Sequence, residues 1–193
     1  MNAELMRLLE NVLRVGIVTE ISEDGKSVRV QSGELKTAWI RWKTGRAGDF
    51  KIWCPPSLGE QVLLGCIGGN PETAILLGSL YSNDNDAPSA SLKQMVITAP
   101  DGARFEYDAA VSALTARGMK TATIQAETKI TLDTAEVECT HHLKAKTFDF
   151  TEGGTMTGDV THSGGKMTSN GVRADDHDHG GVESGGSWTK GTQ

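Results

Sequence analysis

The sequence of 193 residues is poor in the residues that build large cores and nucleic-acid surfaces. Aromatic residues make up 5% and hydrophobic residues 37%, which argues against one large globular enzyme core and favours a thin or repetitive structure. The formal net charge is −6 and Lys and Arg form no run, so the composition gives no support to nucleic-acid binding. The apolar runs, such as residues 74–77, are far too short to span a bilayer.

Cysteine is also scarce. The three cysteines are Cys54, Cys66 and Cys139, and none belongs to a Cys-x-x-Cys pair. This odd number and spacing argue against a disulfide scaffold and a thiolate zinc site, and they fit synthesis in a reducing cytoplasm. The N-terminus carries Glu4 and Glu10 and no small-residue cleavage site, so we expect no secretory signal.

The distribution of glycine and proline divides the chain into three parts. Residues 1–90 hold 10 of the 23 Gly and 4 of the 5 Pro, whereas residues 91–152 hold only two Gly and one Pro. Residues 153–193 hold 11 Gly and no Pro. Because Gly and Pro mark turns, we expect a compact first part and long strands in the second. The third part is expected to contain tight turns or to be a disordered tail.

The first part predicts a short helix followed by a small β-barrel. Leucine and valine recur every three to four residues between residues 2 and 14, which is typical of an amphipathic helix. Short strands then follow one another, and Asp24-Gly25 between the first two is a hairpin signal. This pattern favours an OB-like Greek-key barrel. The predicted strands cover residues 15–21, 27–31, 37–42, 50–53, 61–67 and 73–81.

Barrels of this type often bind oligonucleotides through basic grooves and stacking aromatic rings. Trp39, Arg41, Trp42, Lys43 and Arg46 have the composition of such a groove. The slightly acidic balance of this part of the chain weighs against that hypothesis. The preferred interpretation assigns these residues to the barrel core and to a protein interface.

A polar linker, residues 83–91, separates the barrel from a second β-rich part. Its Asp and Asn residues lack the glycine and the distal glutamate of an EF-hand loop, which favours a solvated linker over a metal site. The strands predicted beyond it alternate small or apolar residues with polar ones. Small side chains cannot bury enough surface in one chain, so we expect three copies to intertwine. These strands are residues 95–99, 103–108, 111–115, 121–126, 129–133, 136–140 and 143–150.

The histidines carry the most specific chemistry. His177 and His179 are two residues apart, so an extended chain presents both imidazoles on one side. Three chains would supply six imidazoles, an octahedral set that points to iron(II), because zinc prefers four ligands. A disordered Gly/Asp/His tail is the alternative. His141 and His142 are adjacent and therefore point to opposite faces, and His162 alone makes no site.

The order of these parts resembles the baseplate assembly protein V, or central tail spike, of contractile-tailed phages and of R-type tailocins. The resemblance is spread over the whole chain and rests on an ordered set of short motifs. These are residues 38–42 (AWIRW), 46–48 (RAG), 53–62 (WCPPSLGEQV), 78–82 (GSLYS), 100–103 (PDGA), 129–134 (KITLDT), 153–156 (GGTM), 162–165 (HSGG), 169–171 (SNG) and 177–180 (HDHG).

The resemblance implies an all-β homotrimer: an N-terminal OB-fold barrel, an intertwined triple-stranded β-helix and a metal-clipped apex. The corresponding domains are residues 1–82, the linker 83–91, the shaft 92–152 and the Gly-rich apex 153–193. The resemblance also implies that His177 and His179 of three chains bind one iron ion octahedrally. Some relatives hold calcium and chloride inside the spike, and no motif here places those ions.

The implied function is mechanical piercing of a bacterial outer membrane, without catalysis. The OB-fold would dock on the tail hub, and the protein would be made in the host cytoplasm and reside in the tail baseplate of a virion or tailocin. One alternative is an OB-type oligonucleotide- or saccharide-binding module with a fibrous trimeric tail. Another is a metal-dependent wall hydrolase acting through His177 and His179, although six imidazoles would leave a catalytic metal no open position.

Overall fold

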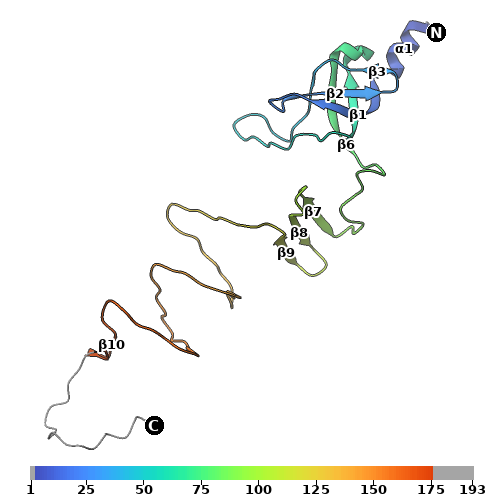
Figure 1. Ribbon diagram of the computed structural model, residues 1–193. Coiled ribbons are helices and arrows are strands. Elements are labelled where there is room, and N and C mark those ends of the chain that lie inside the picture. Colours follow the sequence, from blue (N-terminus) through green and yellow to red (C-terminus); the bar gives the residue numbers. More distant parts are fainter. Residues whose placement is uncertain (1–2, 176–193) are drawn as a thin grey trace, which may run out of the picture. The chain divides into compact units, whose positions relative to one another are not determined.

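The computed structural model describes residues 3–175 and is mostly β (Figure 1). The chain divides into two units, with the boundary between Ala126 and Glu127. Within the described residues, no helix is long and apolar enough to cross a membrane. The predicted domain boundaries at residues 82, 91 and 152 stay predictions.

The N-terminal helix α1 covers Ala3–Glu10 and is shorter than the predicted range of residues 2–14. It ends early because strand β1, Leu13–Ile21, already begins at Leu13, which pairs with Gly65 of another strand. No residue of α1 is buried. Its contact with the rest of the domain is made at the 3-10 turn η1, Ile67–Gly69, where the backbone of Leu8 lies against Gly69.

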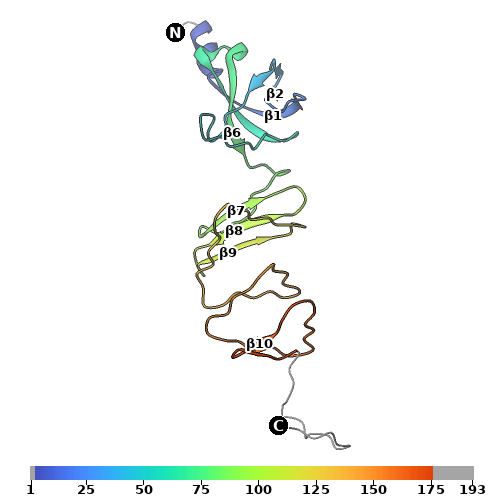
Figure 2. The ribbon, with the colours of Figure 1, turned by 90° about the vertical axis from the view of Figure 1, so that its left-hand side faces the viewer.

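The first unit contains an antiparallel sheet whose strand order is β3-β2-β1-β5-β6, with β4 paired to β2. Figure 2 shows β1, β2 and β6 of this sheet. An isolated parallel bridge also joins Trp42 to Leu76 of β6. The predicted Asp24-Gly25 hairpin is confirmed, since it connects β1 to β2 with Gly25 at φ +69°. The strands are β1 Leu13–Ile21, β2 Ser27–Ser32, β3 Leu35–Lys36, β4 Ile40–Arg41, β5 Gln61–Cys66 and β6 Ala74–Leu80, with the turn η2 Pro71–Thr73 before β6.

The core of this sheet is small and aliphatic. Buried and half-buried residues alternate along β2 and β5, as the period of two predicts for strands with one covered face. Trp42 and Ile21 pack against the core at its edge. The buried members are Val18, Val28, Val30, Ile40, Val62, Leu64, Cys66, Ala74 and Leu76.

The prediction of a strand at residues 50–53 is wrong. This segment is part of a loop in which only the isolated bridge between Ala47 and Lys51 forms. Phe50 is 85% exposed, so the alternation of apolar and charged residues here does not mark a half-buried strand. The strand predicted at residues 37–42 is reduced to Ile40–Arg41.

Three further strands of the first unit form an antiparallel meander, β7 Gln94–Thr98, β8 Arg104–Asp108 and β9 Ala113–Arg117. Their positions agree with the predicted ranges to within two residues. The turn predicted at residues 100–102 is confirmed: the amide of Gly102 donates to the carbonyl of Ala99 at 3.0 Å, with Gly102 at φ +88°.

The chain is extended and unpaired over most of the second unit (Figure 1). Between residues 118 and 167, the four strands predicted at 121–126, 129–133, 136–140 and 143–150 are not strands within one chain. A strand needs a hydrogen-bonded neighbour, and the prediction placed those neighbours in other copies. A small hairpin follows, β10 Thr168–Ser169 and β11 Val172–Arg173.

Candidate functional site

One face of the β7-β8-β9 sheet is apolar and uncovered in the single chain. Register pairs Met95 with Tyr107, Ile97 with Phe105, and Tyr107 with Leu114, so these five side chains share one face. All five are exposed, from 41% for Tyr107 to 79% for Leu114. They are larger than the small residues that the sequence predicts for the buried face. A contiguous apolar sheet face of this kind marks an interaction surface.

The opposite face of the same sheet is mostly polar, although it includes Val96, and its polar side chains form hydrogen bonds and an ion pair with one another. Arg104 forms an ion pair with Glu106 at 2.6 Å. The side-chain amide of Gln94 donates to the carboxylate of Asp108 at 2.8 Å. That hydrogen bond, together with the backbone N–H of Ala110, lowers the pKa of Asp108 below its ordinary value of 3.8. The sheet therefore has one face suited to solvent and one suited to burial.

The extended segment that follows the sheet leaves its apolar side chains exposed. Every residue from 120 to 175 is exposed in the single chain. Residues 119–166 also form no backbone-to-backbone hydrogen bond with one another. Because an apolar, extended chain normally pairs its backbone and covers its side chains, this segment requires partners outside its own chain. Its large apolar residues are Ile124, Ile130, Leu132, Val137, Leu143, Phe148, Phe150, Met156 and Val160.

The predicted metal ligands His177 and His179 lie outside the described residues. His141, His142 and His162 are exposed within the extended segment. Over residues 3–175, no group of three or more His, Cys, Asp or Glu side chains is placed to hold a metal ion. Cys54, Cys66 and Cys139 are all free, and burial raises the pKa of the Cys66 thiol.

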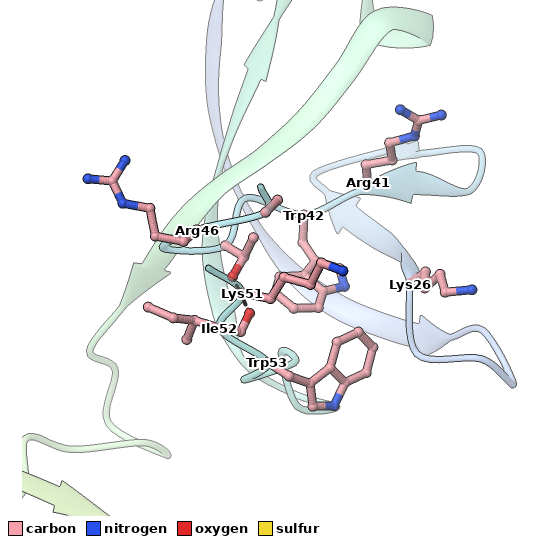
Figure 3. Close-up of a pocket in the computed structure, with 9 residues that line it drawn as sticks. Lys26, Arg41, Trp42, Arg46, Lys51, Ile52 and Trp53 are labelled. Carbon is pink, nitrogen blue, oxygen red and sulfur yellow. Dashed lines mark hydrogen bonds between the residues drawn. The ribbon is translucent and has the colours of Figure 1, made fainter. Parts of the chain in front are cut away.

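A second candidate site is an open pocket of about 270 Å³ on the N-terminal domain. Figure 3 shows Trp42 and Trp53 side by side, with Arg41 and Arg46 extending to opposite sides. The two indole rings meet edge to face, with centroids 5.5 Å apart. Trp42 is fixed, because its indole N–H donates to the carbonyl of Gly25 at 2.9 Å. Lys26, Thr44, Ala47, Lys51 and Ile52 complete the lining.

The loop that carries Trp53 is held by its own backbone. The amide of Ile52 donates to the carbonyl of Arg46 at 3.1 Å, and the hydroxyl of Thr44 donates to the carbonyl of Ile52. A Cβ atom at Gly45 would come within 3.0 Å of the Ile52 side chain, so the two arms of the loop are closely packed. The loop presents Ile52 and Trp53 outward, at 54% and 61% exposure.

The pocket brings together only part of the groove that the sequence suggested. Arg41, Trp42 and Arg46 line it. Trp39 lies elsewhere, with the Arg29 guanidinium 4.7 Å from its ring centroid. Lys26 and Lys51 were missed. Lys26 follows the predicted Asp24-Gly25 turn, but no local pattern shows that this turn lies beside Trp53. Trp53, which was not among the groove residues suggested by the sequence, lines the pocket and is a surface residue at 61% exposure.

Comparison with known proteins identifies both parts of the chain. Residues 14–81 match the family described as type VI secretion system/phage-baseplate injector OB domain, and residues 118–170 match the phage spike trimer family. The chain is 42% identical to the spike protein of Escherichia phage P2 over an alignment of 198 residues, gaps included. The alignment covers 95% of this chain and 93% of that protein. This chain therefore belongs to the family of phage baseplate spike proteins, which are structural components and not enzymes.

Proposed function

We propose that three copies of this chain form the central spike of a contractile tail and pierce the outer membrane of a target bacterium. The observation that carries this proposal is the exposure of every residue from 120 to 175, large apolar side chains included. Covering one such side chain stabilises a structure by about 1.5–3 kcal/mol. Three copies wound into a triple-stranded β-helix would cover them and pair their extended backbones.

The β7-β8-β9 sheet supports the same assembly. Its apolar face, with Phe105 and Tyr107 at the centre, would pack against the same face of the other two copies. The polar network of Arg104, Glu106, Gln94 and Asp108 would remain in water on the outside. The N-terminal OB-type sheet would close into a barrel and dock the spike on the tail hub, in the baseplate of a virion or a tailocin.

Mechanical strength follows from interwoven strands. Such strands have no free sheet edge and separate slowly, since unwinding one chain requires displacing the other two. A spike driven through a membrane by tail contraction needs this kinetic resistance more than a high equilibrium stability. No turnover is involved.

At the tip, we propose that His177 and His179 of three chains hold one iron ion. The donor set is six imidazole nitrogens, which suit iron and exceed the four ligands that zinc prefers. Residues near a chain end are normally the loosest part of a protein. One metal ion bound by all three chains would hold these segments together. Calcium and chloride inside the shaft, as in some relatives, stay a prediction without assigned residues.

The shaft is tested by complementing a spike-deficient phage with Ile130→Asp/Leu132→Asp. These residues share one side of an extended segment, so buried carboxylates should abolish trimers and infectious particles. Thr131→Asp, which places the same charge on the opposite side, is the matched control and should remain trimeric and infectious. Normal infectivity of the double variant would contradict the proposed function.

Iron is tested on the full-length protein by elemental analysis of the size-exclusion peak. Wild type should carry about one iron per three chains. His177→Ala/His179→Ala should lose the iron while the mass of the assembly stays unchanged. A wild-type trimer without iron would contradict the proposed metal site but not the proposed spike.

A further inference from the structure

The pocket between Trp42 and Trp53 is surrounded by positive charge in an acidic protein. Residues 41–53 contain four basic side chains and one acidic one, whereas the whole chain has a net charge of −6. Lys26 adds a further cation and is itself paired with Asp24 at 3.3 Å. Among residues 3–175, no carboxylate forms an ion pair with Arg41, Arg46 or Lys51.

The pocket floor is apolar and preformed. Trp42 is fixed by its hydrogen bond to Gly25, and the loop 44–53 is braced by hydrogen bonds between its two arms. Ile52 and Trp53 nevertheless keep more than half of their surface exposed. Rigid aromatic side chains in a preformed pocket, with cations at the rim, are the features of a docking site rather than of a core.

We propose that this pocket docks an acidic peptide segment of another tail protein. The segment would place an apolar side chain beside Trp53 and set carboxylates against Arg41, Arg46 and Lys51. Charge complementarity selects an acidic partner, because like charges across an interface are repelled. The proposal rests on the proposed function only in naming a tail protein as the partner.

The geometry favours a peptide over single-stranded nucleic acid. Nucleic-acid grooves present ring faces on which successive bases stack. Here the two indole rings meet at an interplanar angle of 63°, and the indole N–H of Trp42 is already used by the backbone of Gly25. A volume of about 270 Å³ suits one apolar side chain with its neighbours.

Charge reversal tests the site in assembled particles. A spike-deficient phage is complemented with wild type, with Arg46→Glu/Lys51→Glu, or with the control Lys36→Glu/Lys93→Glu, which makes the same charge change away from the pocket. Spikes per particle are counted by quantitative mass spectrometry, and the mass of each free protein is measured by light scattering. The pocket variant should remain trimeric but enter particles about tenfold less often than the control.

The experiment distinguishes failure of the proposed spike from failure of the proposed docking site. If the free wild-type protein is monomeric, the proposed spike itself fails. If wild type and the pocket variant are both trimeric and enter particles equally, the docking site alone is overturned. A defect of the same size in the control variant would also overturn it, because the effect would then follow net charge rather than the pocket.

Crosslinking identifies the occupant. Ile52 is replaced by the photoreactive p-benzoylphenylalanine in assembled particles, with Leu92 replaced in the same way as the control. The Ile52 variant should crosslink to a peptide of another tail protein that carries Asp or Glu beside an apolar residue. Crosslinks to nucleic acid, to a basic peptide or to this chain alone would overturn the proposal.

Discussion

At the residue scale, two adjacent glycines differ in why a glycine is needed: one only for its positive φ, the other also for a close backbone contact. Gly68 and Gly69 both have positive φ, +62° and +73°. A Cβ atom at Gly69 would overlap the backbone carbonyl of Leu8, whereas nothing lies within 4 Å of one at Gly68. Only Gly69 is thus required for α1 to rest on η1.

Replacing each glycine by alanine tests this distinction. Gly68→Ala should cost about 1 kcal/mol from strain alone and keep α1 in place. Gly69→Ala carries similar strain and should also release α1, so the amides of residues 3–10 should exchange hydrogen faster. Equal exchange in the two variants would show that α1 does not depend on this contact.

Asp108 gives a pH dependence with a defined sign. Its pKa is lowered in the folded protein, first by the Gln94 amide and then by the backbone of Ala110. The ionised Asp108 carboxylate therefore contributes its full stabilisation of the folded protein at pH values above its ordinary pKa of 3.8. This contribution is lost as the pH falls through the lowered pKa. Asp108→Asn should lower the melting temperature at pH 7, and the difference from wild type should shrink on acidification.

The control for this titration is Asp133→Asn, which removes the same charge from an exposed side chain of the extended segment. A constant difference between wild type and Asp108→Asn from neutral to strongly acidic pH would contradict the assigned role of the Asp108 carboxylate.

At the element scale, turn chemistry explains which parts the sequence could predict. Asp24-Gly25 and the turn at residues 100–102 carry local signals, and both form as predicted. The β10-β11 hairpin was missed although Asn170-Gly171, at φ +49° and +81°, is the same kind of signal. The prediction of a strand at residues 50–53 was wrong because an alternation of apolar and charged residues does not show whether a neighbouring strand exists.

The two faces of the β7-β8-β9 sheet should respond differently to substitution. Phe105→Ser removes an apolar side chain from the uncovered face and should weaken the assembly by about 2 kcal/mol per chain. Thr115→Ser lies on the opposite, polar face and should leave it unchanged. The readout is the temperature at which the oligomer dissociates, followed by light scattering. Equal dissociation temperatures would contradict burial of this face.

At the scale of the whole molecule, one chain is an incomplete structure. Its β1–β6 sheet has a core formed by Val28, Val30 and Leu64, and the sequence predicted most of its strands. Residues 120–175 have no intramolecular core, because their apolar alternation suits neighbours from other copies. The pocket was only partly predictable, since Lys26 and Lys51 reach it from separate loops.

Trimer formation is tested most directly by the solution mass of the full-length protein, measured by sedimentation equilibrium over a wide range of concentrations. We expect a mass of three chains that does not fall on dilution, because the exposed apolar residues of each chain would be covered by the other two. A stable monomer with a native β1–β6 sheet would contradict it, since those residues would then be tolerated in water without partners.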